Sequence, residues 1–201
     1  IDGIAALSKI DPVARGLSDF GKAENWIERQ VGRWQSQLDS YSSFDKYKGP
    51  DIGDVDRVGK WLEQNKPSAM QLGVIHGDYH FSNVMFRYDS GKLAAIVDWE
   101  LATLGDPLLD LGHLMACWPG ALPTALNTNF SLNVGDPEQL IERYAAITER
   151  DMTAWPWFRV LAPYRLGIIL EGTNARADAG LAPRDIGDAL HLMTIGLISM
   201  A

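Results

Sequence analysis

The chain has 201 residues, of which 46% are hydrophobic and 22% charged, a composition typical of a globular protein. Its net charge of −8 argues against a nucleic-acid partner, because phosphate backbones favour basic surfaces, but it does not exclude a phosphorylated ligand held with a metal ion. No apolar stretch reaches membrane-spanning length and no signal peptide opens the chain, so no membrane partner and a cytoplasmic location are expected. The single cysteine, Cys117, lies in an apolar run, which favours a buried thiol over a nucleophile.

The first third of the chain predicts helices. Apolar residues at helical spacing over residues 1–10 predict a helix that stops at Asp11-Pro12. A second helix is predicted over residues 23–44, where apolar residues are spaced four, three, four and three apart: Ile27, Val31, Trp34, Leu38 and Tyr41. A third helix is predicted from Val55 to about Asn65, and a short buried strand over residues 72–75.

Two strand-like runs, residues 84–88 and 93–97, predict a β-hairpin. With a two-residue turn at Ser90-Gly91, Asn83 faces Asp98 at the mouth of the hairpin, with Cα atoms about 4.5–5.5 Å apart. A three-residue turn shifts this pairing by one residue and still leaves the two side chains close.

The loop before the hairpin adds a third polar side chain, Asp78. Amide and carboxylate oxygens are hard ligands that suit Mg²⁺ held jointly with phosphates. The loop and hairpin therefore predict an oxygen-rich metal site with Asn83 and Asp98 as its ligands.

A buried helix is predicted from Pro107 to about Trp118, opened by Asp106, whose carboxylate suits the helix start. Asp110 lies within this apolar helix and needs hydrogen bonds, because a buried carboxylate without partners costs several kcal/mol. The backbone N–H groups of the polar loop are the expected donors. His113 is interpreted as a core histidine.

The remaining segments predict three more helices separated by loops. They are a loop over 119–133, a helix over 136–150, an apolar segment over 155–171 that is kinked or restarted at Pro163, a polar loop or frayed helix over 172–180, and a last helix over 185–200. About seven helices against three short strands predict an α+β fold class, mostly α-helical, in which a small β-hairpin carries the site.

The polar loop, His-Gly-Asp-Tyr-His-Phe-Ser-Asn over residues 76–83, resembles the catalytic loop of the aminoglycoside phosphotransferase family, itself similar to protein kinases. Asp98-Trp99-Glu100 occupies the place of the kinase Asp-Phe-Gly segment, and residues 105–107 and 110–112 match the family's next conserved segment. The resemblance extends to residues 158–166. Within the family, the chain is similar to the kinase-like domains related to those fused to acyl-CoA dehydrogenases.

This resemblance implies a kinase-like phosphotransferase that moves the ATP γ-phosphate to a hydroxyl of a small molecule. Asp78 would be the catalytic base, and Asn83 and Asp98 would hold Mg²⁺ bridging the ATP phosphates. His80 stands where protein kinases often have a lysine near the transferred phosphate, which implies a catalytic role there. His76 is expected to be a structural anchor.

Three further acids surround these residues in the sequence. Asp106 and Asp110 are expected to support the site rather than react. Glu100 has three open interpretations: a second-layer support, a substrate contact or a solvated acid.

Kinases of this type also have an amino-terminal lobe with a Gly-rich loop over the phosphates and a strand lysine. No such segment precedes residue 76, so residues 1–201 are expected to be a single domain equivalent to a C-terminal lobe, with the N-terminal nucleotide-binding lobe absent. Activity is therefore expected of a two-lobed parent rather than of this piece alone.

Two alternatives and the identity of the acceptor remain open. The chain could be a non-catalytic kinase-like binding or regulatory module, or a metal-assisted phosphate hydrolase. The family resemblance allows aminoglycosides, choline-like alcohols, sugars and hydroxyacyl compounds as acceptors. The acidic net charge suits a cationic acceptor, but net charge does not locate a pocket.

Overall fold

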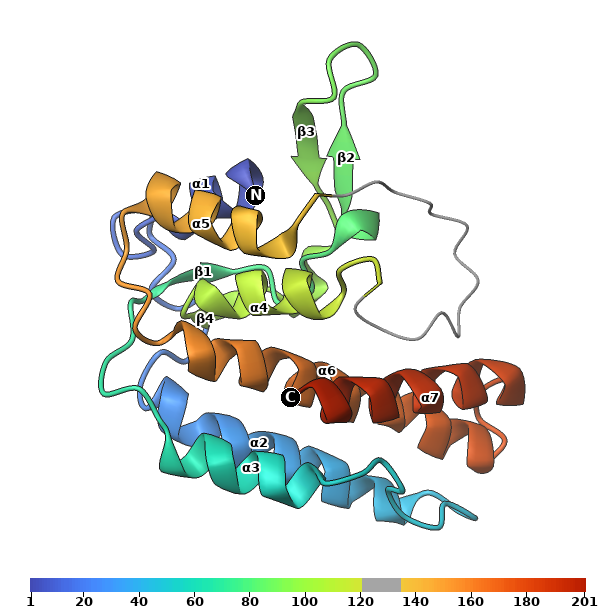
Figure 1. Cartoon of the computed structure of the whole chain (residues 1–201). Coiled ribbons are helices and arrows are strands. Elements are labelled where there is room, and N and C mark those ends of the chain that lie inside the picture. Colours follow the sequence, from blue (N-terminus) through green and yellow to red (C-terminus); the bar gives the residue numbers. More distant parts are fainter. Residues whose placement is uncertain (121–134) are drawn as a thin grey trace.

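The computed structural model describes residues 1–120 and 135–201 and is mostly helical, with two small antiparallel sheets (Figure 1). The predicted class, α+β and mostly α-helical, is confirmed. Most of the loop predicted over 119–133 lies outside the described residues. The described residues form seven α-helices: α1 Asp2–Ser8, α2 Trp26–Ser40, α3 Val55–Gln64, α4 Leu108–Ala116, α5 Pro137–Thr148, α6 Trp155–Asp178 and α7 Arg184–Met200.

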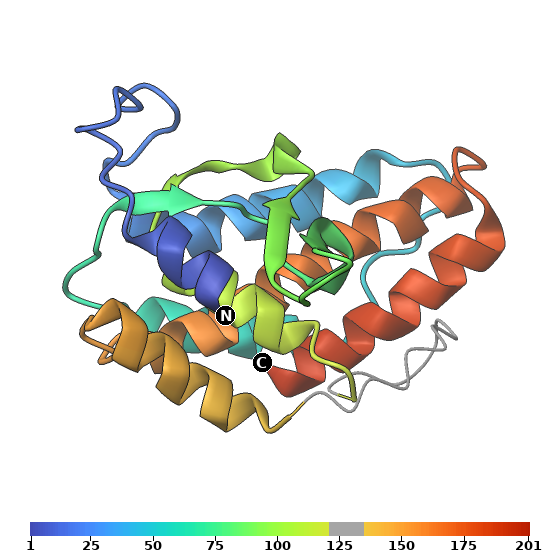
Figure 2. The ribbon, with the colours of Figure 1, turned by 90° about the horizontal axis from the view of Figure 1, so that it is seen from above.

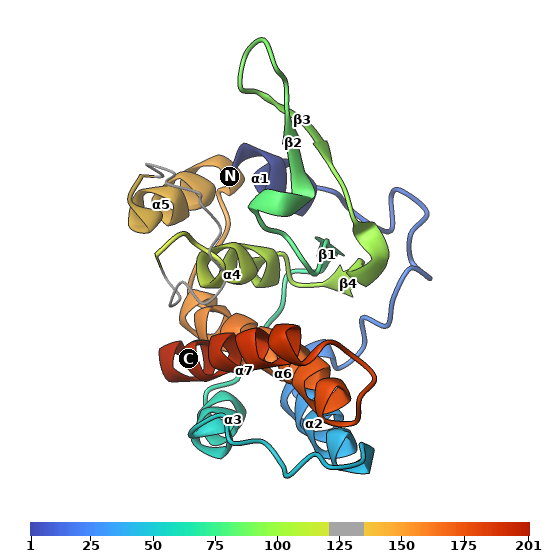
Figure 3. The same cartoon turned by 90° about the vertical axis from the view of Figure 1, so that its right-hand side faces the viewer.

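The helices are stacked on both sides of α4 (Figures 1 and 3). Helices α1 and α5 pack together on one side, and α6, which lies alongside α7, packs against α4 on the other (Figure 2). Helices α2 and α3 pack on α6. Because α4 is enclosed by neighbours, its nearly all-apolar sequence is buried along almost its whole length.

The approach of α4 to α6 depends on Gly112. A Cβ atom at this position would lie 2.7 Å from the backbone oxygen of Phe158 and 2.9 Å from Cβ of Ala162. The absent side chain lets the two helices pack closely, which fixes the position of the polar residues that α4 carries.

Four short strands form two separate antiparallel pairs. Strand β1 (Gly73–Ile75) pairs with β4 (Thr103–Gly105), and β2 (Val84–Phe86) pairs with β3 (Leu93–Ile96). The polar loop joins β1 to β2, so its two ends belong to different strand pairs. Strand β4 is not predicted from the sequence, because three residues are too few to show an alternating pattern.

The hairpin register differs by one residue from the one expected for a two-residue turn. Val84 pairs with Ile96, and a register shift occurs farther out along the strands. At the mouth, the Val97 N–H donates to the Asn83 carbonyl at 2.9 Å, so Asn83 faces Val97 and Asp98 follows one position later. The prediction that Asn83 faces Asp98 is wrong, because the turn is longer than two residues. The structure has the one-residue shift expected for a longer turn.

Helix α6 is longer than predicted. It runs continuously through Pro163, and the segment 172–180, predicted as a loop or frayed helix, is helical as far as Asp178. The polar residues that suggested a loop are used inside the fold. Fully buried Glu171 accepts hydrogen bonds from Tyr47 Oη at 2.8 Å and Asn174 Nδ2 at 2.9 Å.

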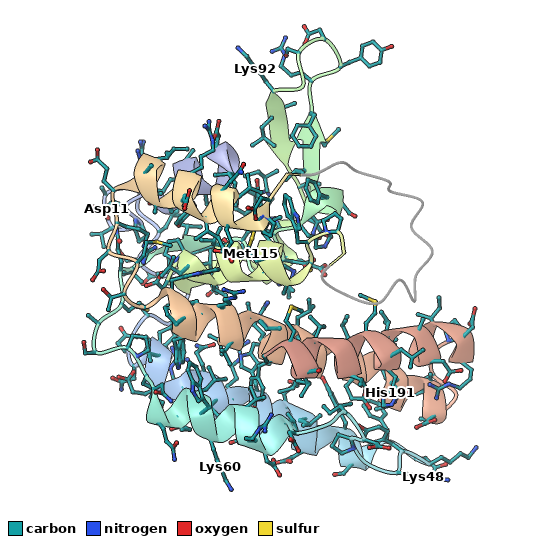
Figure 4. All side chains as sticks on the ribbon, viewed as in Figure 1. Asp11, Lys48, Lys60, Lys92, Met115 and His191 are labelled. Atoms are coloured by element: carbon teal, nitrogen blue, oxygen red, sulfur yellow. The ribbon has the colours of Figure 1, made fainter. Side chains whose placement is uncertain are left out.

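His191 of α7 completes this buried cluster, with Nδ1 2.8 Å from Oε2 of Glu171. Figure 4 shows His191 near the end of the paired α6 and α7, whereas Lys60 and Lys92 project away from the body of the molecule. Buried carboxylates are tolerated where several donors surround them, as they do here.

Two expectations about the surface and the interior can be compared with the structure. In the part of the chain that the structure describes, no helix is both long and apolar enough to cross a membrane. Burial raises the pKa of the Cys117 thiol to about 12, so this group stays protonated at neutral pH. A protonated thiol is a poor nucleophile.

Candidate active site

The polar loop is fixed from below by the buried carboxylate of Asp110 on α4. Its Oδ2 accepts the His76 N–H at 2.7 Å, and its Oδ1 accepts the Gly77 N–H at 2.8 Å. Burial raises the pKa of Asp110, and the two backbone hydrogen bonds oppose that rise by favouring the charged form. Holding two successive N–H groups on one carboxylate determines the path of the loop.

Gly77 and His76 shape the same turn. Gly77 has φ +85°, and a side chain there would collide with the backbone oxygen of Leu101. His76 is fully buried; its Nδ1 accepts the Asp78 N–H at 3.2 Å and its Nε2 lies 2.9 Å from the Val97 oxygen. Because Nδ1 accepts, Nε2 carries the proton and donates it to Val97. His76 thus ties the loop to the hairpin.

Asp78 presents a carboxylate whose side chain is 29% exposed. Asn83 Nδ2 donates to the Asp78 carbonyl at 2.9 Å and to Oδ2 at 3.1 Å. His113 Nε2 lies 3.0 Å from Oδ1, and His80 Nε2 lies 3.5 Å from Oδ2. His113 first, and then His80, hold the pKa of Asp78 well below its usual range, so the carboxylate is ionised at neutral pH.

His113 is the site residue that the sequence interpretation missed. It is 1% exposed, as expected of a core histidine, but it also contacts Asp78. Burial lowers the pKa of His113, so the imidazole is neutral, and Nε2 must carry the proton because an ionised Asp78 only accepts. This N–H is not well aligned with the oxygen, and Nδ1 has no partner among the described residues. The signal was present, because positions 110 and 113 share a helix face.

The buried neutral His113 predicts a pH-dependent stability. Because the unfolded chain takes up a proton near pH 6.5 that the folded chain resists, stability should fall as the pH drops through 6.5. This one group contributes up to about 1.4 kcal/mol per pH unit below that point. Urea unfolding at pH 7.5, 6.0 and 5.0 should show a weaker pH dependence for His113→Gln than for the natural chain. Equal slopes for both would contradict a neutral, buried His113.

Asp98 and Glu100 lie at the mouth of the hairpin, on either side of Trp99. Asp98 has φ +66° and ψ +61°, the left-handed region that aspartate tolerates better than most residues. The Trp99 Nε1–H donates to the Ile96 oxygen at 2.8 Å, which anchors this short turn. Both acids are exposed, and neither carboxylate has a hydrogen-bond or ion-pair partner in the described ranges. Their side chains are therefore available to ligands.

Asp106 holds the start of α4 rather than facing the loop. Its Oδ1 accepts the Leu108 N–H at 2.9 Å, and its Oδ2 accepts the Gln71 N–H at 3.1 Å. Arg150 Nη2 donates to Oδ1 at 2.8 Å in an ion pair that is buried on both sides. The Arg150 partner, 44 residues away in the sequence, was not predicted.

Residues 1–161 match the model of the phosphotransferase enzyme family, which covers most of the chain. The chain belongs to this family. A crystal structure of a candidate aminoglycoside phosphotransferase from Ralstonia eutropha JMP134 superposes with a TM-score of 0.81 at 29% identity. The match covers 98% of this chain and 61% of that one. A kinase-like phosphotransferase fold is thereby established.

Curated relatives of this phosphotransferase-family chain are acyl-CoA dehydrogenase family members. Human member 11 is 28% identical over 183 residues, rat member 11 is 30% identical over 184, and mouse member 10 is 26% identical over 188. These matches cover 88%, 88% and 89% of this chain, but 23%, 23% and 17% of the relatives. The chain thus spans less than a quarter of the length of these relatives. The predicted likeness to this group of kinase-like domains is confirmed.

Proposed function

We propose that this phosphotransferase-family chain carries the catalytic loop of an enzyme that moves the γ-phosphate of ATP to a hydroxyl of a small molecule. The observation that supports this most strongly is the arrangement of Asp78 and Asn83 on one loop, with Asp110 holding the backbone beneath them. The loop is rigid and its apex is solvent-accessible. Phosphoryl transfer needs little more from a protein than such positioning and charge stabilisation.

Asp78 acts as the base in this proposal. The acceptor hydroxyl donates a hydrogen bond to the Asp78 carboxylate, and its proton passes to that carboxylate as the oxygen–phosphorus bond forms and ADP leaves. A low pKa makes Asp78 a weak base, so its main contribution is to orient the hydroxyl. The neutral His113 beneath it restricts the rotation of the carboxylate.

Asn83 and Asp98 have the chemistry to hold Mg²⁺. Asn83 directs its amide nitrogen to Asp78, which leaves its oxygen, the atom that binds hard cations, without a partner among the described residues. The exposed Asp98 carboxylate is likewise unengaged in that part of the chain. When bound, Mg²⁺ neutralises charge on the ATP phosphates.

His80 is assigned a role beside the transferred phosphate, and Glu100 one at the edge of the site. The His80 Nε2 atom lies 3.5 Å from Oδ2 of Asp78 and 3.4 Å from Nδ2 of Asn83, so the ring is next to both functional groups. The His80 side chain is 27% exposed, which leaves it accessible to a phosphate. Exposed Glu100 follows Asp98 by two residues and suits contact with substrate or solvent.

We also propose that residues outside these 201 complete the nucleotide site as an N-terminal lobe. The superposed structure extends beyond the match, which covers 61% of it. Activity is therefore best measured on the complete protein that carries this chain.

Substituting Asp98 tests the metal assignment directly. Asp98→Asn should weaken Mn²⁺ binding, used as a spectroscopic substitute for Mg²⁺, by about 10- to 100-fold in the presence of a non-hydrolysable ATP analogue. Asparagine tolerates the left-handed backbone, so the fold should be kept. Asp56→Asn, which removes an exposed acid from α3, is the matched control. Unchanged Mn²⁺ affinity in Asp98→Asn, measured by electron paramagnetic resonance, would refute the assignment.

A further inference from the structure

A cavity of about 280 Å³ lies beside the catalytic loop, between α2, α6 and the β1–β4 pair. Its lining includes Ile75, the last residue of β1 before the loop. It also includes Leu101, whose backbone oxygen packs against Gly77, next to Asp78. The cavity therefore flanks the loop both where the chain enters it and beside its glycine turn.

Among the described residues, the only charged side chains lining this cavity are two arginines, Arg33 of α2 and Arg165 of α6. They share one aromatic ring: Arg33 Cζ lies 4.8 Å and Arg165 Cζ 5.2 Å from the centroid of Trp34. No acid of the described ranges lines the cavity. The local charge is therefore positive in a chain whose net charge is −8.

Arg165 is unusual because it is buried without a direct counter-ion. It is 6% exposed, and its Nη1 has no hydrogen-bond partner in the described part of the chain. No carboxylate among the described residues pairs with it, although Asp110 and Asp78 are near enough to raise its pKa against the lowering effect of burial. An unpaired buried charge is costly, so stability does not explain this residue. An anion entering the cavity would supply the missing partner.

We propose that this cavity binds the oxyanion of the acceptor, a carboxylate or phosphate monoester on a small hydroxyl compound, through Arg33 and Arg165. Guanidinium groups suit both oxyanions, because their donors match two oxygens at once. The volume is at the lower edge of the range for ligand pockets, which favours a small acceptor over a large polycation. This proposal rests on the proposed phosphotransfer and reverses the cationic acceptor suggested by the net charge.

Binding to the complete protein, measured by isothermal titration calorimetry, tests the proposal with three ligands of similar size. Glycerate and glycerol 3-phosphate carry the two oxyanions, and glycerol carries none. At least one anion should bind about tenfold or more tightly than glycerol, and Arg33→Gln should weaken that binding about five- to tenfold. Whichever anion binds more tightly identifies the oxyanion. Arg33 is exposed, so this variant should fold, and Arg57→Gln, an exposed arginine on α3, should change nothing.

Equal binding of glycerol and both anions, or anion binding unaffected by Arg33→Gln, would overturn the proposal. Tighter binding of choline than of either anion would overturn it as well. The outcome is separable from the proposed function: Arg33-dependent anion binding without any phosphoryl transfer would leave the anion site standing and refute the enzyme. Asp78-dependent transfer to neutral or cationic alcohols alone would do the reverse.

Discussion

Replacing Asp78 by asparagine is expected to lower the rate of phosphoryl transfer by about 10²- to 10⁴-fold, the usual contribution of a positioned general base. Asparagine keeps the size of the side chain and one oxygen, but it cannot accept the acceptor's proton. It also presents an amide nitrogen to one of its three neighbours, Asn83, His80 or His113, which now face a carboxylate. The measurement is the initial rate of ATP-dependent acceptor phosphorylation by the complete protein.

Two controls make that result specific to the chemistry. The melting temperature of Asp78→Asn should stay near that of the natural chain, because the side chain is partly exposed. Asp56→Asn, which changes the same charge on α3, should keep full activity. Full activity of Asp78→Asn would show that the base has been assigned to the wrong residue.

Replacing Asp110 by asparagine is expected to lower the free energy of unfolding by about 3 kcal/mol. The amide can accept only one of the two N–H groups of His76 and Gly77, and its own NH₂ then faces the other. Each buried polar group left without a partner costs about 1–3 kcal/mol. The loop should lose its path as well, so activity should fall although Asp110 lies beneath the reacting groups.

Urea unfolding measures the Asp110 effect. Asp136→Asn is a suitable comparison, because Asp136 caps α5 at the surface, where it accepts the Glu138 N–H at 3.0 Å. That substitution should cost no more than about 1 kcal/mol. A loss at Asp110 as small as the loss at Asp136 would mean that the loop does not depend on its buried carboxylate.

Local patterns predicted most of the helices and the position of the loop. The apolar spacing over residues 23–44 marks α2, and the Asp-Pro pair at 106–107 marks the start of α4. The need of buried Asp110 for donors pointed to the N–H groups of the loop, which is where its two hydrogen bonds go. These features depend on residues close in sequence or on one buried group with few available partners.

The features that escaped prediction depend on contacts across long sequence distances. Segment 172–178 looks polar, yet it is helical because Glu171 and Asn174 find partners on other elements. The hairpin register is set by a turn whose length the sequence leaves ambiguous. Arg165 looked like one charged residue of an apolar helix, and only the fold places it beside Trp34 with Arg33 on the same ring.

The destination of the γ-phosphate of ATP tests the central claim most directly. The complete protein would be incubated with Mg²⁺, γ-labelled ATP and a panel of hydroxyl compounds: glycerol, glycerate, glycerol 3-phosphate, choline, a sugar and an aminoglycoside. Phosphotransfer predicts that the label appears on an acceptor hydroxyl and that Asp78→Asn abolishes its appearance. Release of the label only as inorganic phosphate would indicate a hydrolase, and no turnover of ATP would indicate a binding module; either result would contradict the account.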